Sequence, residues 1–255
     1  MKINILKKAL EEGKTVFGPF CKILDPAVVE LAALAGFDFV IIDMEHGPYS
    51  IETVQQMLRA AEARGITAVV RVTENSETSI LRVLDIGAQC IQVPQIATPE
   101  DAQKVVKSAM FHPKGERGMC RYVRAGDYTA IDKAEHFGRA NENIVTIIHI
   151  EGVSGLENLP SILQNDGIDV IFLGPYDLSQ SCGVPGQVHH EKVVKRMEEA
   201  VVLAKKSGKV VGTFVETVED AKKWEKIGVQ YISYAVDTGL ILNAFKSITA
   251  GLTNH

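Results

Sequence analysis

The stretch FDFVIIDMEHGP, residues 37–48, contains the pattern on which the fold prediction depends. Its apolar run, 37–42, is short and rich in β-branched residues, as is typical of a buried strand. The run ends abruptly in the charged segment Asp43–His46, and Gly47-Pro48 then forces a turn. The stretch therefore predicts a strand whose carboxyl end presents acidic and basic side chains.

Three further charged residues follow similar apolar runs: Arg71 after 67–70, Glu151 after 144–150, and Asp177 shortly after 170–173. In an α/β barrel, catalytic side chains stand at the carboxyl ends of several different strands. The four residues therefore predict one active site at that end of a barrel.

Such runs recur along the chain and alternate with segments of helical periodicity. Strands are predicted at 16–21, 37–42, 67–72, 90–93, 144–150, 170–173, 210–215 and 231–235. Helices are predicted near 26–35, 51–64, 77–86, 99–109, 154–163, 191–207, 218–227 and 240–252, with a loop and a short helix within 111–143. Strands that are almost wholly apolar suit a parallel sheet covered on both faces. We predict an α/β fold, a single (β/α)8 TIM barrel over residues 1–255; a doubly wound open sheet is the alternative, although no G-x-G-x-x-G motif follows the first strand.

Composition narrows the function classes. The chain has 255 residues and a formal net charge of −5, which argues against nucleic acid as the partner because phosphate binding needs a clustered basic face. No apolar stretch approaches the roughly 20 residues that cross a bilayer, so no membrane partner is expected. The four cysteines form no C-x-x-C pair, and the first residues lack the apolar core of a signal peptide. We expect a cytoplasmic protein with reduced thiols.

Two residues suit acid–base work and charge stabilisation. His46 is the natural general base because its ordinary pKa lies near neutrality, and Asp43 is close enough in sequence to orient its ring or hold a water. Arg71 can stabilise an oxygen that becomes anionic in a transition state, although a structural ion pair, for example with Asp85, is also compatible with its position.

Glu151 and Asp177 follow neighbouring strands, so their carboxylates are predicted to share one cation. Two carboxylates completed by water and substrate oxygens suit Mg²⁺ or Mn²⁺, while His149 keeps Zn²⁺ possible and Co²⁺ is a further alternative. Each carboxylate alone could instead complement a helix dipole. None of the four strand ends above carries a lysine, which favours a metal over a Schiff-base amine as the electron sink.

Gly174-Pro175-Tyr176-Asp177 predicts a substrate-binding loop. Glycine allows close approach of a ligand, proline suits a first helical position, and the following amides would then point at a carboxylate.

Taken in order, the motifs resemble the HpcH/HpaI family of class II, metal-dependent pyruvate aldolases, which includes 4-hydroxy-2-oxoheptanedioate and 2-keto-3-deoxy-sugar-acid aldolases. The segments that carry the resemblance are 42–46, 71–72, 84–89, 115–118, 150–151 and 173–178. The resemblance implies a barrel of the phosphoenolpyruvate/pyruvate type that exchanges its C-terminal helix between subunits of a homohexamer.

The resemblance also implies roles for single residues. Glu151 and Asp177 would bind the metal, His46 assisted by Asp43 would be the base, and Arg71 would bind pyruvate and stabilise its enolate. Asp85 would support the His46–Asp43 region, either within its own subunit or from a neighbouring one. The backbone around Gly174, Tyr176 and Asp177 would hold the pyruvate carboxylate, with Pro175 in the same substrate-binding loop, and Phe20 would wall the pocket where Trp is common.

Besides Phe20, three residues depart from the family pattern: His149 replaces a common Gln, Gly152 a Thr or Ser, and Tyr176 an Ala. The predicted activity is cleavage of a 4-hydroxy-2-oxo acid to pyruvate and an aldehyde. The alternatives are a citryl- or malyl-thioester lyase on the same barrel, a non-catalytic metabolite-binding barrel, and a sugar-phosphate isomerase, for which the segments after the last two strands make a poor phosphate cradle.

Overall fold

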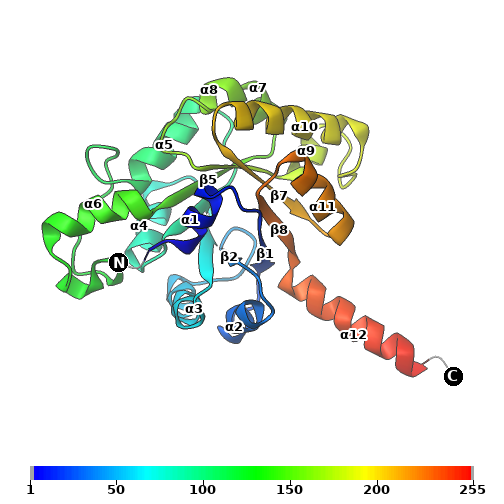
Figure 1. Cartoon of the computed structure of the whole chain (residues 1–255), viewed down its shortest axis with the longest axis horizontal. Helices are drawn as coiled ribbons and strands as arrows, with labels where there is room; N and C mark the ends of the chain where they lie inside the picture. Colours follow the sequence, from blue (N-terminus) through cyan, green and yellow to red (C-terminus); the bar gives the residue numbers. More distant parts are fainter. Residues whose placement is uncertain (1–2, 254–255) are drawn as a thin grey trace.

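Eight parallel strands close into a barrel in the computed structural model of the chain, which describes residues 3–253 (Figure 1). Each strand pairs with its neighbours in sequence, and the first pairs with the last. The strands are β1 (Val16–Cys21), β2 (Phe39–Asp43), β3 (Thr67–Arg71), β4 (Cys90–Val93), β5 (Val145–Ile150), β6 (Val170–Leu173), β7 (Val210–Val215) and β8 (Tyr231–Val236). The predicted (β/α)8 barrel is confirmed, and the open-sheet alternative is wrong.

Helices surround the barrel and cover the outer faces of its strands (Figure 1). They are α1 (Ile5–Glu11), α2 (Ala27–Leu34), α3 (Ile51–Arg64), α4 (Glu77–Asp85), α5 (Pro99–Ala109), η1 (Arg124–Thr129), α6 (Lys133–Asn143), α7 (Val153–Glu157), α8 (Leu159–Ile162), α9 (Pro175–Ser181), α10 (Glu191–Lys206), α11 (Val218–Ile227) and α12 (Asp237–Thr253). Side-chain caps define several starts: Ser50, Ser76, Thr98 and Thr217 each accept a backbone N–H from the first turn.

Two helical segments differ from the prediction. The single helix predicted over 154–163 is two short helices, α7 and α8, because Pro160 lacks a backbone N–H and stands in the first turn of the second. Helix α1 was not predicted. Its Leu6 and Leu10 are buried in the cluster that fills the barrel interior, together with Val16 at the start of β1. Helix α1 therefore covers the end of the barrel where the strands begin.

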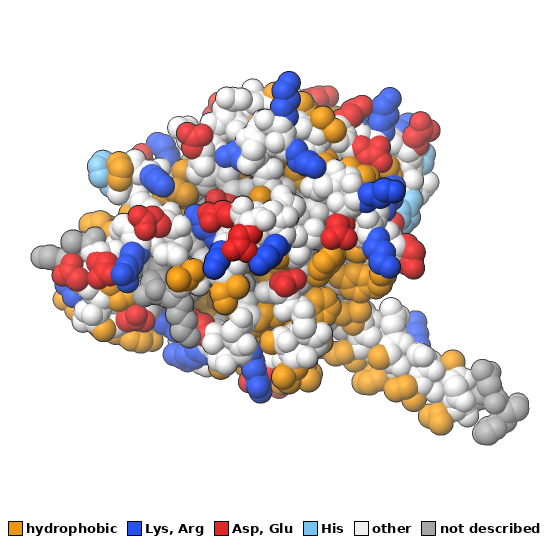
Figure 2. Space-filling model, in the orientation of Figure 1, with side chains coloured by type: hydrophobic (Ala, Val, Ile, Leu, Met, Phe, Trp, Pro, Cys, Tyr) orange, Lys and Arg blue, Asp and Glu red, His pale blue; other side chains and the backbone are white. Residues whose placement is uncertain are grey.

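Helix α12 leaves the barrel after β8 and projects into solvent (Figure 1). Ile241, Phe245, Ile248 and Leu252 recur at intervals of four, three and four residues, so they lie on one face of the helix. All four are exposed, and the projecting helix shows a row of hydrophobic side chains (Figure 2). The first residue of α12, Asp237, is buried against the end of β1, where its carboxylate accepts the backbone N–H groups of Lys22 and Ile23 at 2.9–3.0 Å.

Across residues 3–253, no helix combines the length and the apolar character that a bilayer crossing requires. All four cysteines have free thiols, as predicted.

Candidate active site

A cavity of about 450 Å³ opens at the carboxyl ends of the strands. All but one of the residues selected from the sequence line it: Phe20, Asp43, His46, Arg71, Glu151, Gly174, Pro175, Tyr176 and Asp177. The barrel register explains part of this convergence, because β2 and β3 pair with Asp43 directly beside Arg71. Glu151 and Asp177, distant in sequence, therefore share one cavity with a guanidinium.

Arg71 is held by two carboxylates. Its Nε and Nη2 donate to the two oxygens of Asp43, both at 2.8 Å, and its Nη1 lies 2.9 Å from Glu45 Oε2. Burial alone would raise the pKa of Asp43, but the hydrogen bonds and charge of Arg71 outweigh it and hold that pKa below its ordinary value. Burial also raises the pKa of Glu45, and Arg71 opposes that rise only in part. The guanidinium, which also lies over the Phe20 ring at 4.7 Å, is therefore fixed in one orientation.

His46 is less constrained than the sequence suggested. Asp43 Oδ1 accepts the backbone N–H of His46 at 3.3 Å, while the side chain of His46 is 60% exposed. The nearest charged partner of its ring is Glu45, with Nε2 3.9 Å from Oε2. Among the described contacts, the Asp43 carboxylate is bonded to Arg71 and to backbone N–H groups and not to the His46 ring, so the direct support is wrong, and the alternative in which Asp43 holds a water stays a prediction.

Glu151 is buried and held at both oxygens. The backbone N–H of Gln95 donates to Oε1 at 2.8 Å, and His149 Nδ1 lies 3.0 Å from Oε2. Burial would raise the pKa of Glu151, but the hydrogen bonds of His149 and of the Gln95 N–H and the charge of Arg71 hold it below its ordinary value. Glu151 is therefore an anion with a fixed direction at any working pH.

Asp177 contrasts with Glu151. It lies in the first turn of α9, its residue is exposed, and no described residue hydrogen bonds or ion pairs with its carboxylate. Within residues 3–253 there is no cluster of three or more His, Cys, Asp or Glu side chains that could hold a metal ion. The available donors are thus one anchored and one unengaged carboxylate, a set that suits a hard divalent ion completed by water and ligand oxygens.

The absence of a side chain at Gly174 leaves room for the Glu151 side chain. A Cβ at position 174 would lie 2.8 Å from Glu151 Cβ and 2.8 Å from its Oε2. The close approach that the sequence assigned to a ligand is therefore made, in this structure, by the Glu151 side chain. Pro175 and Tyr176 begin α9, and the Tyr176 hydroxyl donates to Glu216 Oε2 at 2.6 Å.

Gly174→Ala should consequently displace the Glu151 carboxylate and lower the free energy of unfolding by about 1–3 kcal/mol, as overpacking does. Gly152→Ala is the matched control: its nearest neighbour would be Ser181 Oγ at 3.8 Å, so there is room. Urea unfolding of the two variants measures the difference. Equal stability for both would show that Glu151 does not need the space.

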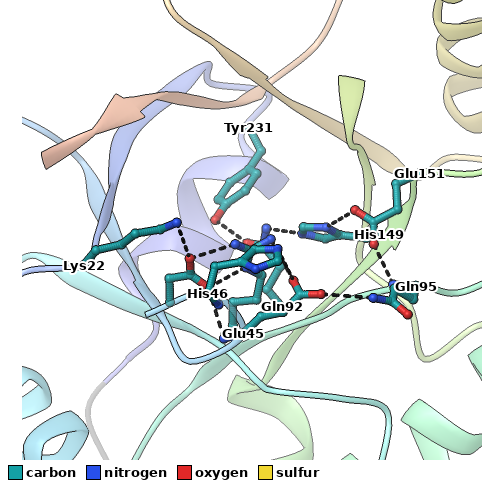
Figure 3. A network of polar contacts seen from close by, with 10 residues as sticks. Lys22, Glu45, His46, Gln92, Gln95, His149, Glu151 and Tyr231 are labelled. Atoms are coloured by element: carbon teal, nitrogen blue, oxygen red, sulfur yellow. Dashed lines mark hydrogen bonds and ion pairs between the residues drawn. The ribbon is translucent and has the colours of Figure 1, made fainter. Parts of the chain in front are cut away.

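One cavity residue and several residues of the polar network beside it were missed from the sequence. Lys22 lines the cavity with its Nζ 3.6 Å from Asp43 Oδ2. It follows β1, a strand end outside the four that were considered, and its position directly after Cys21 was the available signal. Gln92, Gln95 and Tyr231 also belong to the polar network around Glu151 (Figure 3).

Asp85 lies away from the cavity. It ends α4 and accepts a hydrogen bond from Arg117 Nη2 at 2.7 Å. The suggested ion pair between Arg71 and Asp85 is therefore wrong, since Arg71 pairs with Asp43 and Glu45 instead. A role for Asp85 in the site of a neighbouring subunit stays a prediction.

Known proteins match this chain over almost its whole length. The profile of the family described as HpcH/HpaI aldolase/citrate lyase matches residues 17–244. A 2-keto-3-deoxy-L-rhamnonate aldolase of Salmonella gallinarum is 34% identical over 96% of this chain and 91% of its own length. A 4-hydroxy-2-oxo-heptane-1,7-dioate aldolase of Escherichia coli is 32% identical over 97% of this chain and 94% of its own.

A solved structure, that of the citrate synthase SbnG, is 34% identical, has a TM-score of 0.88 and covers 96% of both chains. The predicted family and the predicted enzyme class, a lyase of the aldolase type, are confirmed by these likenesses. The chain belongs to the HpcH/HpaI aldolase/citrate lyase family.

Proposed function

We propose that the protein is a metal-dependent pyruvate aldolase that cleaves a 4-hydroxy-2-oxo acid into pyruvate and an aldehyde. The observation that carries this proposal is the shared cavity of Glu151, Asp177 and Arg71. The named relatives, which are aldolases for oxo acids of this kind, support the reaction class.

Charge supports a divalent cation in this cavity. Four carboxylates line it, those of Asp43, Glu151, Asp177 and Glu216, against two cations, Lys22 and Arg71. An anionic oxo acid would add to the excess of negative charge. Glu151 and Asp177 would hold the metal, which would act as a Lewis acid toward the 2-oxo group.

Mg²⁺ or Mn²⁺ fits these donors better than Zn²⁺ or Co²⁺. Oxygen ligands suit the harder ions. His149 could have favoured zinc, but its two ring nitrogens are engaged by Gln92 and Glu151.

Each residue of the site then has a separate role in the reaction. His46 takes the proton of the C4 hydroxyl, the C3–C4 bond breaks, and its electron pair becomes the enolate of pyruvate. Arg71, already oriented by Asp43 and Glu45, faces the oxygen on which negative charge develops. The proton that His46 took up returns to the enolate at C3, which completes pyruvate and restores the base. The backbone N–H groups of Tyr176 and Asp177, in the first turn of α9, receive the carboxylate, and Phe20 walls the pocket.

Pyruvate release tests the proposal. A series of 4-hydroxy-2-oxo acids is incubated with the protein in Mg²⁺ or Mn²⁺ and, in parallel, in EDTA. We expect pyruvate only with metal. Release that persists in EDTA would remove the metal from the mechanism, and no release from any member of the series would remove the aldolase.

His46→Ala is expected to lower kcat by about 10²-fold, near the lower end of the range for a positioned acid or base, because its exposed ring is only loosely held. His189→Ala is the control, since His189 lies outside the cavity on the protein surface. The measurement is pyruvate release as a function of pH. An unchanged kcat and pH profile would exclude His46 as the base.

A second candidate reaction is carbon–carbon bond formation of the citrate synthase type. The likeness to SbnG favours it, since this citrate synthase is as similar to the chain as the named aldolases. This reaction has more support than the citryl- or malyl-thioester lyase alternative. Incubation with acetyl-CoA and oxaloacetate, with detection of free thiol, separates it from the aldolase.

We also propose that the chain forms one domain, resides in the cytoplasm and assembles as a homohexamer in which subunits exchange α12. The exposed apolar face of that helix supports an assembly, because a row of solvated apolar side chains usually marks a contact surface.

Phe245→Asp combined with Ile248→Asp should then dissociate the oligomer, because the substitutions place charge on the apolar face. Lys246→Glu, on the same exposed helix but in the polar sequence between them, is the control and should leave the mass unchanged. Sedimentation velocity gives the mass of each variant. A wild-type monomer, or an oligomer that survives both aspartates, would contradict the proposal.

A further inference from the structure

A chain of three side-chain hydrogen bonds crosses the barrel interior and ends on Glu151 (Figure 3). The Tyr231 hydroxyl, from β8, donates to Gln92 Oε1 of β4 at 3.1 Å. Gln92 Nε2 contacts His149 Nε2 on β5, and His149 Nδ1 contacts Glu151 Oε2. All four residues are buried, so water does not compete for these bonds.

The direction of the chain follows from its donors and acceptors. Burial raises the pKa of Tyr231 well above its ordinary value, so the phenol keeps its proton and donates. Gln92 then presents its carbonyl to Tyr231 and its NH₂ group to His149. An imidazole nitrogen that accepts from Gln92 carries no proton. The proton of His149 is therefore on Nδ1, where it is donated to Glu151.

Stacking contacts hold two of the rings in this row of hydrogen bonds, those of Tyr231 and His149. Tyr231 stacks on Phe39 with centroids 4.3 Å apart, and His149 stacks on Phe172 with centroids 4.5 Å apart. The second oxygen of Glu151 is held by the Gln95 backbone. Neither ring can turn without losing a stack, so the tautomer of His149 and the direction of the carboxylate are set together.

We propose that His149 is a positioning residue for Glu151, and that Tyr231 and Gln92 act through it by fixing its tautomer. This inference rests on the proposed function, in which Glu151 binds the metal. Side chains that hydrogen bond a ligating group orient it and typically contribute 10–100-fold in metal affinity. In this protein, the residues that orient Glu151 include Tyr231 on the opposite side of the barrel. They act through His149, where the family resemblance predicts glutamine.

The affinity for Mn²⁺, measured by electron paramagnetic resonance of the free ion, is the first test. His149→Leu should weaken binding by about 10–100-fold. His149→Gln should restore most of it, because an amide can accept from Gln92 and donate to Glu151. Tyr231→Phe should also weaken binding, whereas Tyr49→Phe removes a different buried tyrosine hydrogen bond, to Ile23 O, and should not.

The double variant separates a relay from independent packing effects. If Tyr231 acts through His149, Tyr231→Phe has no further effect on Mn²⁺ affinity in the His149→Leu protein. Additive losses would overturn the relay, as would a Tyr231→Phe affinity equal to that of Tyr49→Phe.

The second test needs no metal. In ¹⁵N-labelled metal-free protein, His149 should show a protonated Nδ1 and an unprotonated Nε2, and this signature should be lost in Tyr231→Phe but kept in Tyr49→Phe. A proton on Nε2 of the native protein would overturn the inference. If the native protein bound no Mn²⁺, the proposed function would fail, and the spectrum would still decide whether the relay fixes the tautomer.

Discussion

Arg71→Lys is expected to lower kcat for pyruvate release by about 10²–10³-fold, the loss that follows removal of a preorganised donor to a developing oxyanion. Lysine keeps the charge, but it has no planar fork. It therefore cannot donate to both oxygens of Asp43 and reach Glu45, as the guanidinium does. The ammonium would lie in several orientations, and few of them would face the enolate oxygen.

The same substitution should also lower the free energy of unfolding by about 1–3 kcal/mol, because the buried Asp43 carboxylate loses a hydrogen bond. Arg64→Lys is the matched control: Arg64 donates Nε and Nη2 to Glu30, but on the surface. It should change neither quantity measurably. A kcat for Arg71→Lys within threefold of the wild-type value would show that charge alone, without the fork, is sufficient.

Glu151→Gln is expected to weaken Mn²⁺ binding by at least about 10²-fold, more than a change in a residue that only supports a ligand. The substitution removes one of two carboxylates while keeping the shape. It also places an NH₂ group opposite either the Gln95 N–H or the His149 Nδ1–H, so one pair of donors must face each other. At a fixed micromolar metal concentration, turnover should fall by about 10³-fold, since a Lewis acid supplies several kcal/mol.

Metal titrations of turnover and of Mn²⁺ binding measure these effects. Partial recovery of turnover at millimolar Mn²⁺ is expected. Because the pKa of Glu151 is held below its ordinary value, the native carboxylate stays charged at neutral and mildly acidic pH, so mild acid should not release the metal through this residue. Native affinity in Glu151→Gln would place the metal elsewhere.

The barrel could be predicted because its strands are nearly continuous apolar runs, and because charged residues mark where several of them end. Helix α1 could not, since seven residues with two buried leucines give too short a pattern. Its role depends on packing into the barrel end, which is a tertiary contact.

Most of the residues selected from the sequence line one cavity, but the contacts among them were not predicted. Asp43 and His46 are three residues apart, and that spacing suggested a partnership. The register of β2 against β3 instead gives the Asp43 carboxylate to Arg71. Gln92 and Tyr231 stand inside apolar strands, where a polar residue reads as an interruption of the pattern. Only barrel closure shows that Tyr231 points toward Gln92, and Gln92 toward His149.

Asp237 links helix α12 to the segment that follows β1. It is the first residue of α12, and its carboxylate holds the backbone immediately after β1, where Lys22 enters the cavity. A displacement of the projecting helix would therefore be transmitted through the hydrogen bonds from Lys22 and Ile23 to the rim of the cavity. If a second subunit binds this helix, the contact would also stabilise the entrance of the cavity. The shape of that entrance would then depend in part on assembly.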